Sequence, residues 1–181
     1  HSTGKMGYAL ARAAAMRGAD VTLIHGETAL PPVKFTTDVP VTTAQDLYEA
    51  VTDRFDTTDV LIMAAAVADY RPATVSQHKM KKGDGELSIP LSRTEDILRW
   101  VAEHRHPGLF VCGFSMETRD LIENSRAKLE KKHLDMNAAN SLNTEGAGFG
   151  VPTNVVTLLT PDGAEQLPLL GKDEVAARLL D

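Results

Sequence analysis

The chain has 181 residues, of which 43% are hydrophobic and 24% charged, and this balance excludes general disorder. Its single cysteine, Cys112, excludes an internal disulfide and a multi-cysteine zinc site, and we expect it to be an inert core residue. A net charge of −6 argues against non-specific nucleic-acid binding, and no apolar run is long enough to cross a bilayer. We therefore expect one cytoplasmic domain over residues 1–181 that binds neither nucleic acid nor membranes.

Helical and strand patterns alternate through the first half of the chain. Alanine-rich sequence with apolar residues at helical spacing comes first, and Gly18 supplies a helix stop. Thr42 and Thr43 are candidates for the N-cap of the next helix. The predicted elements are helices over 4–17 and 44–54, strands over 21–24, 39–41 and 59–66, and a long functional loop over 68–85.

The alternation continues in the second half. Pro90 favours an edge strand, Thr94 is a candidate N-cap, and Pro161-Asp162-Gly163 is typical of a hairpin turn. The predicted elements are strands over 86–91, 109–112 and 135–139, helices over 95–104, 119–133 and 172–180, and hairpin strands over 154–159 and 165–168. This order predicts a doubly wound, mostly parallel α/β sheet of the Rossmann-like kind, with an appended antiparallel hairpin.

The first predicted helix starts with Ser2, Thr3, Gly4 and Lys5. Small residues there expose backbone N–H groups to an anion, which the helix dipole and Lys5 would also attract. The alternative is an ordinary N-cap, since the segment has neither P-loop spacing nor a G-x-G-x-x-G dinucleotide fingerprint. Because the chain begins at His1 within this turn, we expect a further strand and loop to precede it.

Small residues also end the predicted strand over 59–66. Ala64, Ala65 and Ala66 would let a planar ligand approach the backbone, and Asp69 offers a hydrogen-bond acceptor beyond them. Tight packing of the strand under a helix would explain the alanines as well. It would leave the run Asp69-Tyr70-Arg71 unexplained.

Lys79, Lys81 and Lys82 concentrate positive charge in the long loop of an acidic chain. Such a run is typical of a mobile lid that closes on phosphate. It is also typical of a solvated loop tip, which is the commoner occurrence.

Lys128 and Lys132 stand four residues apart, so a helix would place both on one face. They could bind phosphate there, although neighbouring charges also suit an ordinary solvated surface. Asn137 and Asn140 bracket the end of the predicted strand over 135–139, where asparagine is also a routine turn former.

Together these segments resemble the phosphopantothenoylcysteine synthetase family, the synthetase half of bacterial coenzyme A biosynthesis proteins. The matching stretches keep the family's order over nearly the whole chain. They are HSTGKMG (1–7), RGADVTL (17–23), AAAVADYR (64–71), KMKK (79–82), EDIL (95–98), GFSMET (113–118), KLEKKHLD (128–135) and Ala139-Asn140.

The resemblance implies an enzyme that joins 4′-phosphopantothenate to cysteine. The family activates the carboxylate with CTP, which releases pyrophosphate and leaves an acyl-cytidylate, and the cysteine amine then displaces CMP. Mg²⁺ balances the triphosphate. The resemblance also implies a homodimer and, in many relatives, a flavin-dependent decarboxylase domain upstream.

The resemblance further implies roles for individual residues. Lys79 is expected to be a catalytic lysine of the lid, and no protein ligand for a metal is expected. The nucleotide would be bound by Met63, Ala64, Ala65, Asp69, Lys79, Glu95, Asp96, Ile97, Leu98, Phe114, Lys128 and Lys132. The other substrate would be bound by Ser2, Thr3, Gly4, Lys5, Ala66, Arg71 and Asn140.

Two other functions remain as alternatives. A short-chain-type NAD(P)-dependent oxidoreductase would account for Thr3-Gly4 before an alanine-rich helix, but the sequence has no Tyr-x-x-x-Lys pair. A non-catalytic nucleotide-binding module would account for the same fold without the chemistry.

Overall fold

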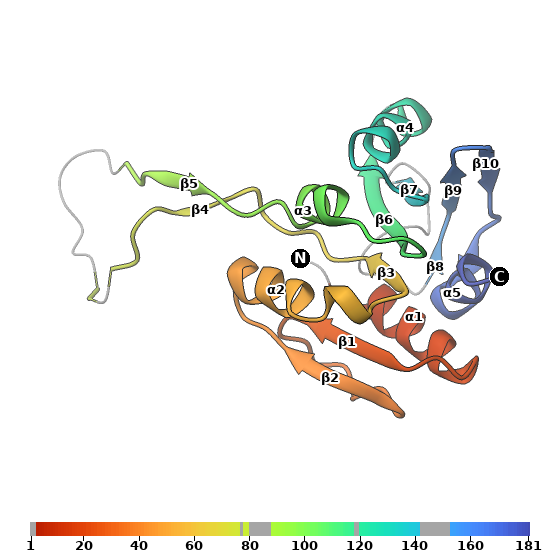
Figure 1. The fold of residues 1–181 in the computed structure, drawn as a ribbon, viewed down its shortest axis with the longest axis horizontal. Coiled ribbons are helices and arrows are strands. Elements are labelled where there is room, and N and C mark those ends of the chain that lie inside the picture. The colour runs from red at the N-terminus through yellow and green to blue at the C-terminus, as the bar shows by residue number, and fades with distance from the viewer. Residues whose placement is uncertain (1–2, 77, 80–87, 118–119, 142–152) are drawn as a thin grey trace.

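The computed structural model describes residues 3–76, 78–79, 88–117, 120–141 and 153–181. A five-stranded sheet in the order β10-β9-β7-β6-β3 lies at its centre (Figure 1). β3 (Val60–Met63), β6 (Phe110–Glu117) and β7 (Met136–Ser141) are parallel, and β9 (Val156–Thr160) and β10 (Gly163–Gln166) form an antiparallel hairpin beside β7. The predicted α/β class, with its mostly parallel strands and added hairpin, is confirmed.

A separate parallel pair stands beside this sheet. β1 (Val21–His25) pairs with β2 (Thr36–Pro40), so the second strand starts three residues earlier than the predicted strand over 39–41. α1 (Lys5–Met16) and α2 (Ala44–Thr52) pack against β1. Thr43 caps α2, because its Oγ1 accepts the Asp46 N–H at 3.0 Å while Asp46 Oδ2 accepts the Thr43 N–H at 2.8 Å.

Two apolar layers cover the faces of the central sheet. α3 (Ile97–His104) and α4 (Leu121–Lys131) pack on one face in a cluster that contains Val101, Leu129 and Leu159. α1 and α5 (Lys172–Leu179) lie side by side on the other, in a cluster that contains Ala9 and Val156. Because side chains alternate along a strand, neighbouring residues of β7 belong to opposite layers.

The prediction of a long loop over 68–85 is wrong near its start, where the structure has a strand. β4 (Tyr70–Pro72) pairs antiparallel with β5 (Leu91–Arg93), and this two-stranded arm projects from the body (Figure 1). The edge strand predicted over 86–91 therefore starts only at Leu91 within the described residues. Local sequence gave too little signal here, since the pairing joins segments about twenty residues apart.

Other boundaries also differ from the predictions. β3 ends at Met63, so the predicted strand over 59–66 is too long, and Asp96 rather than Thr94 caps α3. β6 and β7 extend beyond their predicted ends, because pairing with neighbouring strands continues past the apolar runs. The strand predicted over 154–159 is divided into two strands, β8 (Thr153–Asn154) and β9. β8 pairs with β11 (Leu170–Gly171). A short helix, η1, spans Phe55–Thr57.

Candidate functional site

The carboxyl ends of β3, β6 and β7 share one edge of the sheet, because these strands are parallel. Open α/β sheets bind their ligands at this edge. Helix α3 and helix α4 supply polar side chains on one layer of the edge, and α1 and α5 supply them on the other.

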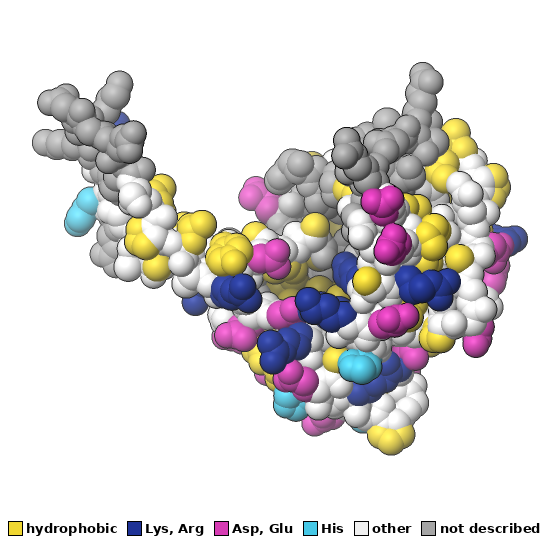
Figure 2. Space-filling model, turned by 90° about the horizontal axis from the view of Figure 1, so that it is seen from above, with side chains coloured by type: hydrophobic (Ala, Val, Ile, Leu, Met, Phe, Trp, Pro, Cys, Tyr) yellow, Lys and Arg dark blue, Asp and Glu magenta, His cyan; other side chains and the backbone are white. Residues whose placement is uncertain are grey.

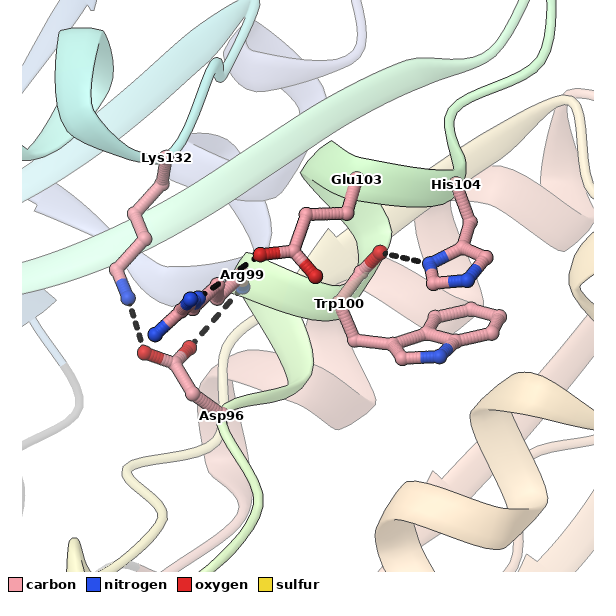
Figure 3. Close-up of polar contacts among 6 residues, drawn as sticks. All are labelled: Asp96, Arg99, Trp100, Glu103, His104 and Lys132. Carbon is pink, nitrogen blue, oxygen red and sulfur yellow. Dashed lines mark hydrogen bonds and ion pairs between the residues drawn. The ribbon is translucent and has the colours of Figure 1, made fainter.

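Asp96 joins the start of α3 to the end of α4 (Figure 3). Its Oδ1 accepts the Arg99 N–H at 3.0 Å, and its Oδ2 is ion-paired with Lys132 Nζ. Burial raises the pKa of Asp96, but the hydrogen bonds and charges of Lys132 and Arg99 outweigh it and hold the pKa below its ordinary value. Asp96 is therefore a carboxylate that positions a lysine at the helix start.

Some side chains of α3 also contact one another (Figure 3). Arg99 Nε donates to Glu103 Oε1 at 2.9 Å, and the rings of His104 and Trp100 are stacked with centroids 4.2 Å apart. A shallow groove of about 270 Å³ adjoins this surface. It is lined by Arg99, Ala102, Glu103, Lys131, Lys132 and His133.

Lys128 contacts the middle of β6. Its Nζ donates to the Phe114 carbonyl oxygen at 2.5 Å, and its side chain is half-buried. Lys128 and Lys132 thus lie on the α4 layer, one at β6 and the other at α3. Lys128 lies within α4 and Lys132 is its C-cap, so the predicted helix spans the interval between the two lysines.

A buried polar cluster lies under α4. The Oγ atoms of Ser115 and Ser125 are 2.8 Å apart, and Asn137 Nδ2 donates to Ser115 Oγ at 3.0 Å and to the Ser125 carbonyl at 2.9 Å. Asn137 lies inside β7, so its interpretation as a turn former is wrong. The two serines were not among the predicted residues, because a lone hydroxyl in β6 or in the largely polar α4 gives no local signal.

The second set lies at the start of α1 and α5. Gly4 caps α1 with a φ of 74°, a conformation that favours glycine. Lys172 opens α5 with only 8% of the residue exposed, and its Nζ donates to Asn154 Oδ1 at 3.2 Å. Asn140, at the end of β7, is also 8% exposed. Lys172 and Asn154 were not among the predicted residues, because charged residues follow Lys172 in the first turn of α5 and nothing local indicates that this lysine is buried.

The remaining predicted residues are spread more widely. Met63 and Ile97 are core side chains, so only their backbone could face a ligand, whereas Ala65 and Ala66 are exposed beyond β3. Lys79 is exposed and follows β4 in the arm, so the single chain does not bring it to Lys128 and Lys132. The other predicted residues are also exposed or half-buried: Thr3, Lys5, Ala64, Asp69, Arg71, Glu95, Leu98 and Phe114; Ser2, Lys81 and Lys82 lie outside the described residues.

Figure 2 shows the surface that these elements form. Lysine and arginine side chains alternate with acidic ones over the body, and hydrophobic side chains cover much of the described part of the arm. No three His, Cys, Asp or Glu residues gather as metal ligands among the described residues. Within the same ranges, every helix is too short or too polar to pass through a membrane.

The fold and these contacts define a doubly wound α/β protein with two polar groups on the two faces of its central sheet. Residues 1–181 match the family described as the DNA/pantothenate metabolism flavoprotein C-terminal domain. The chain belongs to this family, which confirms the resemblance found in the sequence. Membership argues against the short-chain oxidoreductase alternative.

Curated relatives carry the name coenzyme A biosynthesis bifunctional protein CoaBC. The chain is 45% identical over 181 residues to the protein of Bacillus subtilis, and 41% identical over 185 residues to that of Escherichia coli K12. These alignments cover 99% and 100% of this chain but 44% and 45% of the relatives. The chain thus spans a little under half of their length.

Solved structures agree with the fold. The crystal structure of the C-terminal domain of a CoaBC protein has a TM-score of 0.83 and 40% identity, covering 99% of this chain and 80% of that one. A mutant of Cab2 in complex with phosphopantothenate-cysteine has a TM-score of 0.81 at 17% identity, covering 99% and 77%. At that identity the second likeness shows the fold alone.

Proposed function

We propose that this chain is the synthetase part of a phosphopantothenate–cysteine ligase. The observation that carries the proposal is the separation of two cationic groups on the two faces of the sheet. Lys128 and Lys132 lie on the α4 layer, and Lys5 and Lys172 lie on the α1 layer. A reaction between a nucleoside triphosphate and a second phosphorylated substrate needs two such anion sites. The name of the CoaBC relatives supports a role in coenzyme A biosynthesis.

The proposed chemistry has two steps. A carboxylate oxygen of 4′-phosphopantothenate attacks the α-phosphorus of CTP, and the bond to pyrophosphate breaks to leave an acyl-cytidylate. The cysteine amine then attacks the acyl carbon, the bond to CMP breaks, and the nitrogen loses a proton as the amide forms. A carboxylate is already nucleophilic, so cations near the triphosphate would supply most of the help in the first step.

Lys128 and Lys132 are proposed to contact the phosphates of CTP. Lys132 is now ion-paired with Asp96, so a triphosphate would compete with that carboxylate for the ammonium. The backbone N–H groups at the start of α3 lie beside the same carboxylate and face the nucleotide in this proposal. Asp96 would then hold Lys132 in place until the nucleotide binds.

Mg²⁺ is expected from the family but does not fit a protein cage here. The described residues contain no group of three His, Cys, Asp or Glu that could hold it. Magnesium commonly binds through substrate phosphates and water with few protein ligands. In this proposal Mg²⁺ is held by substrate phosphates and water.

The projecting arm supports the proposal of a homodimer. Tyr70, Val75 and Leu91 are 51%, 85% and 59% exposed, and apolar side chains on a projecting hairpin favour burial against a partner. A second copy lying on the arm would bring Lys79 close to another body. Sedimentation analysis tests this proposal: a monomer at micromolar concentration would contradict it.

Pyrophosphate release tests the function. We expect release from CTP only when 4′-phosphopantothenate is present, with cysteine needed for the amide product. Lys132→Met should raise the KM for CTP about tenfold or more. Lys131→Met, at the exposed neighbouring lysine, is the control and should change this KM little. Release that ignores phosphopantothenate would exclude the proposed function.

Two further measurements separate the alternatives. A rise in Tm with CTP but not with NAD is expected, and the reverse would favour an oxidoreductase. Lys79→Gln should strongly reduce amide formation, with Lys34→Gln, at another exposed lysine, as the control. Normal turnover by Lys79→Gln would favour the alternative interpretation, in which the lysine run is a solvated loop tip.

The flavin-dependent decarboxylase partner and the cytoplasmic location are also proposals. The bifunctional name of the CoaBC relatives supports the former.

A further inference from the structure

Lys172 is a buried cation whose position the proposed chemistry has not yet explained. Only 8% of the residue is exposed, and its Nζ donates to the neutral amide oxygen of Asn154, which is itself 1% exposed. Burial, and then the charge of Lys5, lower the pKa of Lys172 below its ordinary value. Two ammonium groups therefore repel each other at the start of α1 and α5, and an anion bound beside them would relieve that repulsion.

Asn140 supplies an independent sign of a ligand at the same place. It pairs with Val156 across β7 and β9, so both side chains lie on the α1 and α5 face of the sheet. Asn140 is 8% exposed, and its Oδ1 has no hydrogen-bond partner among the described residues. Buried amide oxygens are nearly always satisfied, so an orphaned one indicates a missing donor.

The two groups lie at the same end of the same layer. Asn154 precedes Val156 by two residues, and its amide holds Lys172 on the α5 side. The antiparallel pairing of Asn140 with Val156 places that end of β9 at the carboxyl end of β7. A ligand there would combine an anionic group for the lysines with a hydrogen-bond donor for Asn140.

We propose that Lys172, positioned by Asn154, binds the phosphate of the phosphorylated acid substrate together with Lys5. This inference rests on the proposed function and extends it to a residue outside the motifs that carry the family resemblance. The acid substrate also carries amide N–H and hydroxyl donors, either of which suits Asn140 Oδ1. Lys128 and Lys132 belong to the opposite layer, so the nucleotide phosphates would bind at a different site from the phosphate of the acid substrate.

The test replaces Lys172 with methionine, which keeps much of the length and removes the charge. The change removes the Lys172 donor from the buried Asn154 Oδ1, which costs stability, but it also removes the repulsion between Lys172 and Lys5, so we expect a folded variant with a modestly lower Tm. Calorimetry on the full chain should show 4′-phosphopantothenate binding weakened about ten- to 100-fold. Binding of unphosphorylated pantothenate and of CTP should change less than about twofold. Lys172→Arg should keep part of the affinity, and Lys34→Met is the control.

The outcomes separate this inference from the proposed function. Inorganic phosphate is the second probe: if it competes with the acid substrate in the wild type but not in Lys172→Met, the phosphate site stands, even if pyrophosphate release fails. Equal weakening of CTP and phosphopantothenate overturns the inference, as does unchanged phosphopantothenate affinity. A fall in Tm without selective loss of phosphate affinity would give Lys172 a structural role only.

Discussion

Replacing Asp96 by alanine should destabilise the protein through two contacts that meet at one carboxylate. Oδ1 caps α3 by accepting the Arg99 N–H at 3.0 Å, and Oδ2 pairs with Lys132. Loss of an N-cap costs about 1 kcal/mol of the free energy of unfolding. The Asp96 side chain is 48% exposed, so the ion pair adds about 0–1 kcal/mol after solvent screening. The sum is about 1–2 kcal/mol.

Thermal unfolding of the full chain measures this effect. In a protein of this size, 1 kcal/mol corresponds to about 2–4 °C, so Asp96→Ala should lower the Tm by about 2–8 °C. Asp96→Asn keeps an oxygen for the cap and should lose about 0.5 kcal/mol or less. Glu95→Ala removes the exposed acidic neighbour and should lie within about 0.5 kcal/mol of the wild type.

The pH dependence gives a second readout of the same carboxylate. Because the folded pKa of Asp96 is below its ordinary value of 3.8, its stabilisation is present above that value. It is lost as the pH falls through the folded pKa, so the advantage of the wild type over Asp96→Asn should disappear there. An Asp96→Asn variant as unstable as Asp96→Ala, or a Glu95→Ala variant equally affected, would refute the cap.

Two further predictions concern titratable groups away from the site. Burial lowers the pKa of His25, but hydrogen bonds with Gly26 and Asp38 and the Asp38 charge outweigh it, so the pKa is raised above 6.5. Urea unfolding should therefore show that the wild type is more stable than Asp38→Asn at about pH 5.5. This difference in stability should fade as the pH rises through the folded pKa of His25. An equal difference at about pH 8.5 would contradict the pairing. Burial raises the pKa of Cys112 to about 12. A thiol reagent at neutral pH should therefore label the native protein slowly and the urea-unfolded protein quickly. Fast labelling of the native protein would show that the thiol is accessible.

Local patterns in the sequence predicted most of the helices and strands. The alternation of helical and apolar segments was enough for the α/β class, because strands interspersed with helices of this length favour a sheet that is covered by helices. Thr43 and the Pro161-Asp162-Gly163 turn were found because caps and tight turns depend on adjacent residues. The lysines of α4 were found for the same reason, since their spacing fixes a helix face.

Long-range pairing decided what the sequence could not. Tyr70 and Arg93 pair across a segment that looked like a loop, and no residue near either one specifies the other. The choice of Asp96 over Thr94 as a cap depended on where α3 meets Lys132. Thr94 instead donates to the Ala68 carbonyl at 2.5 Å, which ties the arm to the start of α3.

The sequence by itself determined the fold class, the family resemblance and the types of residue available for binding anions. Only the tertiary structure decided which of them share a layer. Register across β7 and β9 places Asn140 on the α1 face, and the packing of α5 buries Lys172 beside Asn154. The physical reason is that burial and charge proximity depend on contacts between residues distant in sequence, whereas periodicity and capping depend on neighbours.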